Sequence, residues 1–329
     1  MAEAVRRLDE MNPLLWLVLR RVLLSFVSFL VVSVIIFTAV DILPGDTAQR
    51  ALGREATAES VAILRSEMRL SDPAIVRYGR WLGDFVSGDL GTSMVSKRPV
   101  ADYLVPPLRH TLLLGAIVLA VHIPLSLFLG LVCALTRDTP LDLGLSALVL
   151  VAMSVPDFVV GIFLIVVFSV ELGWFPPLAL IDQATSWTDM LYMLTLPILA
   201  LNAAMTAYVV RQTRDSMIEV LNSDFVRVAR LRGLPPLQIV LAHALPSALG
   251  PAINAIALNA AWLVGGIVVI EAVFNYPGLG RLLVEGVRFH DVPIIQAIAL
   301  ILSGTHIALN LAADIGTTLL NPKLRTRSS

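Results

Sequence analysis

Four charged residues lie within the stretch 224–232 of this 329-residue sequence, between two long apolar runs. Acidic and basic side chains alternate there with apolar ones at helical spacing, so we expect a short amphipathic helix. Gly233 supplies a turn, and Pro235-Pro236 stops the helix from continuing. Such a helix offers recognition, not catalysis. It either lies on anionic lipid headgroups or docks against another protein, and its residues alone leave both open.

The two faces of this predicted helix differ in composition. The apolar face is expected to carry Phe225, Val228, Ala229 and Leu231. The other face, turned toward water or another protein, is expected to carry Asp224, Arg227, Arg230 and Arg232. Beyond the turn, a second amphipathic piece leads into the next apolar run through His243, Leu245 and Pro246.

Asp157 is the one acidic residue inside six long apolar runs that contain no lysine or arginine. It directly follows Pro156, and a proline at this position removes a backbone hydrogen bond and bends a helix. A charged side chain inside a bilayer costs about 3 kcal/mol unless it faces water or a partner. Two interpretations stay open: the carboxylate meets an ammonium group or a cation in a pathway, or it is a neutral or hydrogen-bonded structural residue.

Three further polar residues are weaker candidates for lining a pathway: Asn202, Asn259 and Glu271. Lone polar residues in helix bundles usually make interhelical hydrogen bonds, so a structural role is the default for the two asparagines. Glu271 ends the fifth apolar run beside a glycine- and proline-rich turn. It either rims an outer gate, caps a helix or bonds to the external loop.

Several kinds of chemistry are excluded. Lys97 and Lys323 follow serine and proline, so neither completes the Gly-Lys-Ser/Thr of a phosphate-binding loop, and we expect no ATP hydrolysis by this chain. Zinc-protease and serine-hydrolase signatures are absent from the sequence. The single cysteine, Cys133, cannot build a disulfide or a thiolate metal site within the chain. We therefore expect no catalytic residue, no metal, no cofactor held by this chain and no nucleic-acid partner.

Composition identifies the elements that must position these residues. Of all residues, 57% are hydrophobic and 15% are charged, and mean hydropathy is +0.82. Soluble domains are roughly 45–50% apolar and about 25% charged. Six runs reach the roughly 20 apolar residues that a membrane-spanning helix needs. We therefore predict an all-α integral membrane protein with six transmembrane helices, since barrel strands are much shorter.

Arginine placement gives the orientation, because short cytoplasmic connections are rich in arginine and lysine. The loop 219–246 and both termini are arginine-rich, so they are predicted to be cytoplasmic. Thr57 and Asp72-Pro73 read as helix caps in a small external helical domain. The predicted division is 1–21 cytoplasmic; 22–42, 110–136, 142–170, 191–218, 247–272 and 292–316 transmembrane; 43–109 an external cap; 171–190 and 273–291 external loops; 219–246 a cytoplasmic loop; and 317–329 a cytoplasmic tail.

Six motifs occur in one order along the chain. They are Leu43-Pro44-Gly45-Asp46, Gly88-Asp89-Leu90-Gly91-Thr92-Ser93, Ser154-Val155-Pro156-Asp157-Phe158, Ala229-x-x-x-Gly233 followed by His243-Ala244-Leu245-Pro246, Glu271-Ala272-Val273-Phe274 with Pro277-Gly278-Leu279-Gly280-Arg281, and Asn321-Pro322-Lys323-Leu324-Arg325. Together they resemble the binding-protein-dependent permeases of dipeptide, oligopeptide and nickel ABC importers, of the type with a large external loop after helix one. The resemblance runs from Arg20 to Arg325, although Arg227-Val228 replaces the first two letters of the Glu-Ala-Ala motif.

The resemblance implies a type I importer permease fold in a bacterial cytoplasmic (inner) membrane. It implies that the loop 219–246 contacts an ATPase through Asp224, Phe225, Arg227, Val228, Ala229, Arg230, Arg232, Gly233, His243, Leu245 and Pro246. Implied partners are a second, related permease, two ATPase subunits that bind ATP and magnesium, and an extracytoplasmic binding protein. The implied substrates are di- or oligopeptides, with nickel complexes, glutathione-like peptides or opines as alternatives. A secondary transporter would show paired broken helices, and no such pair is evident.

Overall fold

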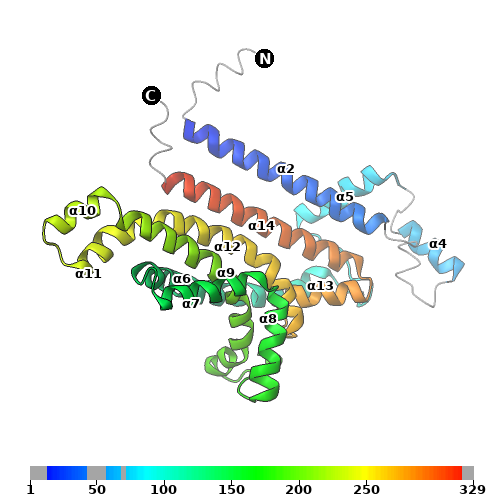
Figure 1. The fold of residues 1–329 in the computed structure, drawn as a ribbon. Helices are drawn as coiled ribbons and strands as arrows, with labels where there is room; N and C mark the ends of the chain where they lie inside the picture. The colour runs from blue at the N-terminus through cyan, green and yellow to red at the C-terminus, as the bar shows by residue number, and fades with distance from the viewer. Residues whose placement is uncertain (1–12, 43–56, 68–71, 321–329) are drawn as a thin grey trace, which may run out of the picture.

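The computed structural model describes residues 13–42, 57–67 and 72–320, and this part of the chain is almost entirely helical (Figure 1). The one β-type contact within it is an isolated bridge between Thr92 and Pro99. The helical elements in chain order are α2 (Pro13–Ile42), α4 (Ala58–Glu67), α5 (Ala74–Ser87), α6 (Val100–Leu135), α7 (Pro140–Ser154), α8 (Asp157–Leu164), the π-helical η2 (Ile165–Glu171), the 3-10 turn η3 (Ile181–Gln183), α9 (Trp187–Leu221), α10 (Asp224–Leu231), α11 (Pro236–Gln238), the π-helical η4 (Ile239–Ala244), α12 (Leu245–Val273), α13 (Leu279–Arg288) and α14 (Val292–Leu320).

Five helical stretches in the described residues are long and apolar enough to cross a membrane. They are Trp16–Val40, Val100–Leu135, Trp187–Leu221, Pro236–Val273 and Val292–Thr318. The sixth predicted span is a pair of helices, α7 followed by α8 and η2, bent by 107° at a short break. The all-α fold with six apolar spans is thus confirmed when the bent pair counts as one span.

The break between α7 and α8 corrects the prediction of one continuous helix over 142–170. Val155 is extended, with φ −105° and ψ 128°, and Pro156 precedes the first turn of α8. Proline lacks a backbone N–H and disfavours the helical conformation in the residue before it, so the two residues together end α7. Asp157 therefore lies at the start of α8 and not within an unbroken helix.

Several helices extend beyond the ranges predicted as transmembrane. The first begins at Pro13 instead of residue 22, and α6 begins at Val100 within the predicted cap 43–109. The predicted external loop 273–291 contains the helix α13. Apolar runs mark where a helix can contact lipid, whereas helix ends depend on local caps and turns, so the two need not coincide.

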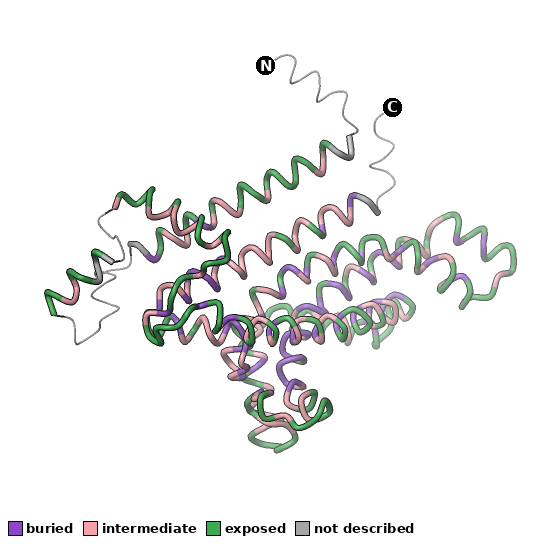
Figure 2. Tube along the Cα trace, turned by 180° about the vertical axis from the view of Figure 1, so that it is seen from behind, coloured by how far each residue is buried: buried purple, intermediate pink, exposed green. Residues whose placement is uncertain are grey.

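The most buried long helix is α9, which packs against α6, α7, α8 and α12 (Figure 2). The backbones of α6 and α9 approach closely, because a Cβ on Gly130 would lie 2.6 Å from the Thr213 side chain. Small residues allow such approaches between membrane helices. In contrast, α2 packs mainly along α14 and is largely exposed in Figure 2. Most of its surface is therefore free for lipid or for another subunit.

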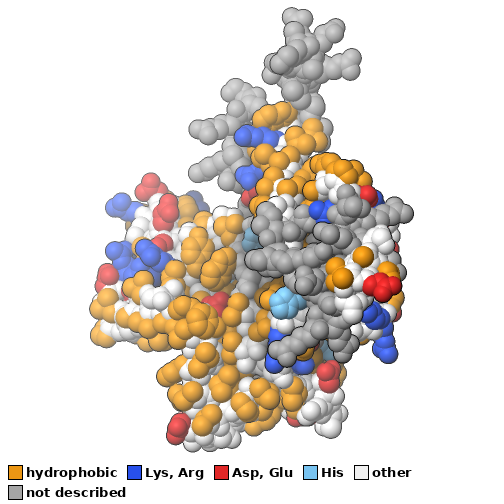
Figure 3. Space-filling model, turned by 90° about the vertical axis from the view of Figure 1, so that its right-hand side faces the viewer, with side chains coloured by type: hydrophobic (Ala, Val, Ile, Leu, Met, Phe, Trp, Pro, Cys, Tyr) orange, Lys and Arg blue, Asp and Glu red, His pale blue; other side chains and the backbone are white. Residues whose placement is uncertain are grey.

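A hairpin of α8, η2 and the first turns of α9 projects from the rest of the molecule (Figure 1). Its exposed side chains include Phe163, Val166, Val170 and Trp174. Figure 3 shows that the corresponding lower part of the molecule is covered mostly by hydrophobic side chains on this face. Such a surface is suited to lipid or to another apolar protein surface.

The described part of the external cap contains the short helices α4 and α5. Thr57 caps α4 as predicted, because its Oγ1 accepts a hydrogen bond of 3.1 Å from the backbone N–H of Ser60. Asp72 does not cap α5: its carboxylate accepts a hydrogen bond of 2.7 Å from Arg80, and Pro73 is the residue before the helix.

The motif at residues 43–46 and the C-terminal motif at 321–325 lie outside the described residues.

The helix α5 is joined to the outer end of α2. Tyr78 lies 2.8 Å from Ser33 between their hydroxyl oxygens, and the rings of Tyr78 and Trp81 pack against Phe37. Figure 1 places α4 and α5 at one end of the molecule and the loop with α10 and α11 at the opposite end. The two predicted extramembrane regions are therefore at opposite ends of the helix bundle.

Candidate functional site

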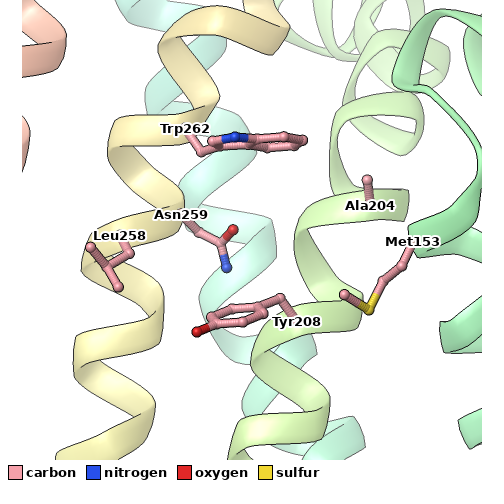
Figure 4. Close-up of a pocket in the computed structure, with 6 residues that line it drawn as sticks. All are labelled: Met153, Ala204, Tyr208, Leu258, Asn259 and Trp262. Atoms are coloured by element: carbon pink, nitrogen blue, oxygen red, sulfur yellow. The ribbon is translucent and has the colours of Figure 1, made fainter.

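A groove runs between α9 and α12 beside the break that separates α7 from α8. One lobe has a volume of about 370 Å³ and is lined by Met153, Ala204, Tyr208, Leu258, Asn259 and Trp262 (Figure 4). An adjoining lobe of about 360 Å³ shares Met153, Ala204 and Trp262 with the first. The second lobe is otherwise lined by Ser154, Val155, Pro156, Asp157, Phe158, Gly266 and Val269. The groove is mostly apolar, with few polar groups.

Asp157 is half-buried in the second lobe, where the start of α8 faces α12. A Cβ on Gly266 would lie 2.9 Å from its Oδ2 atom, so the glycine leaves the space that the carboxylate occupies. Within the described residues, no hydrogen bond or ion pair involves the Asp157 carboxylate. The hydrogen-bonded structural role that the sequence left open for Asp157 is therefore absent from this part of the chain.

The predicted pathway residues fall into two groups. Pro156, Asp157 and Asn259 line the groove, and the amide of Asn259 donates a hydrogen bond of 3.4 Å to the Met205 carbonyl of α9. Asn202 lines neither lobe: it is buried and donates to the Ile198 carbonyl of its own helix at 2.9 Å. The structure therefore brings together three of the five residues.

Glu271 is fully buried at the outer end of α12 and lines neither lobe of the groove. Its carboxylate accepts hydrogen bonds of 2.6 Å from the Thr111 hydroxyl and from the backbone N–H of Gly280. The Thr111 oxygen in turn accepts a bond of 2.8 Å from the N–H of Leu279. Of the open alternatives, Glu271 thus bonds to the external segment, where it holds the start of α13 against α6 and α12.

Tyr276 closes the same cluster from the external side. Burial, reinforced by the negative charges of Glu271 and Asp182, raises the pKa of the Tyr276 phenol, which keeps its proton. The hydroxyl donates a hydrogen bond of 2.7 Å to the His110 carbonyl at the start of the apolar part of α6. The hydrogen bonds of this outer cluster thus connect the helices α6, α12 and α13.

The charged loop forms the predicted helix α10, but its buried face differs from the expected one. Val226 and Ala229 are buried, whereas Phe225 and Val228 are exposed and Leu231 is 81% exposed. Of the four apolar residues predicted to share one face, Ala229 is therefore the one that is buried against the bundle. The short return segment after the turn packs on Val226 and Ala229, so the inward face of α10 is narrow.

Residues 224–246, which include α10, are called the docking loop here, and most of their side chains are exposed. Gly233 ends the turn with φ +76°, a conformation that favours glycine, so its predicted role is confirmed. The exposed charged residues are Asp224, Arg227, Arg230 and Arg232. His243 lies 3.3 Å from the Gln238 carbonyl, and Leu245 and Pro246 begin α12. The loop therefore presents apolar and cationic side chains together.

Sequence reasoning missed the aromatic walls of the groove, Trp262 and Tyr208. Both lie on strongly apolar helices, where an aromatic residue facing lipid has the same sequence pattern as one facing a groove. The available signal was the placement of Asn259 and Trp262 nearly one turn apart on one face of α12. That face could be assigned only once the position of α9 was known.

Two family models cover most of the chain. The model described as binding-protein-dependent transport system inner membrane component matches residues 126–326, and the corresponding N-terminal model matches residues 14–115. The chain belongs to this family of inner-membrane transport components. It is a multi-pass permease subunit of an ABC importer, and the predicted recognition is confirmed.

Individual relatives and a solved structure agree with the family. The chain is 37% identical to glutathione transport system permease protein GsiC of Escherichia coli (strain K12) over 308 residues, covering 94% of this chain and 98% of the relative. The protein of the same name from Salmonella paratyphi A is 37% identical over 309 residues, with the same coverage. A structure of the inward-facing MetNI methionine ABC transporter matches with a TM-score of 0.54 at 20% identity, covering 66% of this chain and 96% of that one. This structural likeness supports the fold.

Proposed function

We propose that this permease, together with a second, related permease, forms the membrane channel of an importer for small peptides. Two ATPase subunits would bind ATP and magnesium and dock on the cytoplasmic side, and an extracytoplasmic binding protein would deliver the peptide. The chain itself contributes no catalytic residue, metal site or cofactor site to this proposal. Membership of a binding-protein-dependent transport family supports the division of labour.

The exposed docking loop is the observation that carries the proposed ATPase contact. Phe225, Val228 and Leu231 point away from the bundle among arginines, which is costly in water unless another surface covers them. Protein interfaces combine apolar contacts with arginine in this way. The interfacial-lipid alternative is less favoured, because α10 has only eight residues and part of its apolar face, Val226 and Ala229, is already packed against the bundle.

The substrate proposal rests on the relatives. The curated relatives are named for the transport of glutathione, which is itself a small peptide. We therefore place small peptides, including glutathione-like ones, ahead of nickel complexes and opines. A groove of small volume with one carboxylate is consistent with a small substrate carrying a positive group.

Co-purification of the ATPase tests the docking loop. The variant Phe225→Ser/Val228→Ser/Leu231→Ser removes three exposed apolar side chains and leaves the buried Val226 and Ala229 in place. We expect the variant to insert normally but to lose the ATPase subunits that co-purify with the unaltered complex. The ATPase remaining bound at its normal stoichiometry would refute the assignment of this loop.

A matched control comes from the opposite end of the molecule. Val284, Val287 and Phe289 are likewise exposed apolar residues in and just after the short helix α13. Replacing these three with serine changes surface apolarity to a similar degree, and ATPase binding should be unaffected. Equal loss in both triple variants would show a general folding defect and would contradict a specific contact at α10.

A further inference from the structure

We propose that the groove beside the α7–α8 break binds the ammonium end of the transported peptide, with the Asp157 carboxylate as its counter-charge. This inference rests on the proposed transport of peptides and names the residue that selects among them. It follows from the charge, the aromatic walls and the size of the groove.

The first argument is the unpaired negative charge of Asp157 in the groove. Asp157 is the only charged residue among the described residues that line the two lobes, and no positive side chain in the described part of the chain pairs with it. The other walls are mostly apolar, so an anion held there is poorly compensated unless a cation enters. An ammonium group is the cation that every unmodified peptide carries, and it donates charge-assisted hydrogen bonds to a carboxylate.

The position of Asp157 at the start of α8 explains how an unpaired carboxylate is stabilised in this mostly apolar groove. It occupies the first turn of α8, where the free backbone N–H groups carry partial positive charge and favour an anion. The charge is thus tolerated without a permanent partner from the chain. Gly266 leaves the space that the carboxylate occupies, so the carboxylate stays open to a ligand.

The aromatic walls add a second feature that suits a cation. In Figure 4, the rings of Trp262 and Tyr208 border the first lobe, with the Asn259 amide between them on the α12 side. Trp262 is 59% exposed and belongs to both lobes, so it connects the aromatic lobe to the carboxylate. Ammonium groups bind over the faces of tryptophan and tyrosine rings. A carboxylate next to aromatic faces is therefore a coherent site for one ammonium group.

The size and lining of the groove restrict what else the ligand presents. Each lobe is close to the lower limit of roughly 300–1,000 Å³ for small-molecule sites, which suits the end of a peptide. Phe158, Leu258 and Val269 offer contacts for an apolar side chain next to the ammonium group. The described lining contains no basic residue, so this groove offers the peptide's carboxylate no counter-charge.

Charge replacement at position 157 tests the inference. The complete importer is reconstituted in liposomes with ATP inside, and a saturating amount of binding protein loaded with one unmodified dipeptide is supplied outside. Because the same loaded binding protein serves every variant, a change in uptake arises in the membrane part. We expect Asp157→Asn to reduce uptake about tenfold or more, as expected for losing a charge-assisted hydrogen bond, and Asp157→Glu to retain most of it.

A charge-rescue variant separates recognition from folding. The native cysteine is buried and can be removed as Cys133→Ser, after which Asp157→Cys carries the one thiol. Modification with a sulfonate-bearing thiol reagent should restore uptake, and an equally large trimethylammonium-bearing reagent should not. A purely structural role for Asp157 would make the two reagents equivalent. The exposed Asp138, changed to asparagine, is the matched control and should leave uptake unchanged.

Three results would overturn the inference. One is unaltered uptake by Asp157→Asn, and another is equal behaviour of the two thiol reagents. The third is loss of the second permease from the purified Asp157→Asn complex, which would make Asp157 an ion-pair partner across the subunit interface. If the unaltered complex imports no peptide with ATP inside, the proposed function itself fails, and that result is distinguishable because it does not depend on residue 157.

Discussion

At the scale of single residues, the outer end of the bundle is packed so closely that two glycines have no room for a side chain. A Cβ on Gly280 would overlap the backbone of Val268, and one on Gly278 would overlap the Glu271 carboxylate. Both glycines belong to the segment that Glu271 and Thr111 tie to α6 and α12. The glycines of this motif thus serve the close contact between α12 and α13.

Replacing Gly280 with alanine should therefore destabilise the protein. The added methyl group meets backbone atoms of α12, which cannot rotate away, so we expect a loss of about 1–3 kcal/mol in the free energy of unfolding in detergent. Gly144→Ala is the control, because Gly144 lies within the helix α7 with no atom within 4 Å of its Cβ position. Gly280→Ala being as stable as the control would contradict the described packing.

Single residues of the candidate site differ in how well the sequence predicts them. Asp157 was identifiable because a carboxylate in an apolar run is rare, and Gly233 because a turn between two helices favours glycine. Trp262 could not be assigned to the groove from the sequence, since only the position of α9 distinguishes a groove-facing ring on α12 from a lipid-facing one. The burial of Glu271 also depended on Thr111, a residue far away in the chain, which no local pattern brings next to it.

At the scale of elements, α7 and α9 are joined by an ion pair between the buried Asp142 and the partly exposed Arg214, near the docking loop. Arg214 donates to both carboxylate oxygens of Asp142, at 2.8 Å through Nε and at 2.7 Å through Nη2. Asp142 is 1% exposed and also accepts the backbone N–H of Asp138. This bidentate contact fixes the start of α7 against the end of α9 from which the docking loop extends.

We expect Asp142→Asn to cost about 1.5–3 kcal/mol in the free energy of unfolding, because the partly exposed Arg214 loses its bidentate partner and keeps only the contact with Asp215. Asp138→Asn alters an exposed pair with Arg137 and should cost about 0–1 kcal/mol. Thermal unfolding of both variants in the same detergent provides the comparison. Similar stability of the two variants would show that the Asp142–Arg214 pair does not hold α7 to α9.

The elements themselves were predictable to different degrees. Six apolar runs were visible because a helix in lipid must expose apolar side chains along its length. The bend at Pro156 was only partly predictable, because many prolines kink a helix without ending it, and Pro106, Pro107 and Pro124 all lie inside α6. The helix α13 was missed because its ten residues include charges and its buried side is defined by α12 and α14.

At the scale of the whole molecule, the topology depends on whether the bent α7–α8 pair crosses the membrane. Arg137 and Gln183 flank this pair, and both are exposed, as is Gln238 in the docking loop. In a Cys133→Ser background, single cysteines at these positions can be labelled with a reagent that does not cross membranes. We predict that Arg137→Cys and Gln238→Cys react only after the membrane is opened, and Gln183→Cys reacts in intact cells.

A re-entrant pair would give a different labelling pattern. Arg137→Cys and Gln183→Cys would then react from the same side, and the chain would have five spans. The unaltered protein, in which Cys133 is buried, is the background control. It should not react with the reagent either before or after the membrane is opened.

We propose that this permease is a passive conduit, driven by ATPase subunits that dock on its loop 224–246. The most direct test is uptake of a labelled small peptide into liposomes that contain the complete complex, with the loaded binding protein outside. We predict uptake with ATP inside and none with a non-hydrolysable analogue. Peptide uptake by this chain alone, driven by an ion gradient without ATP, would contradict it.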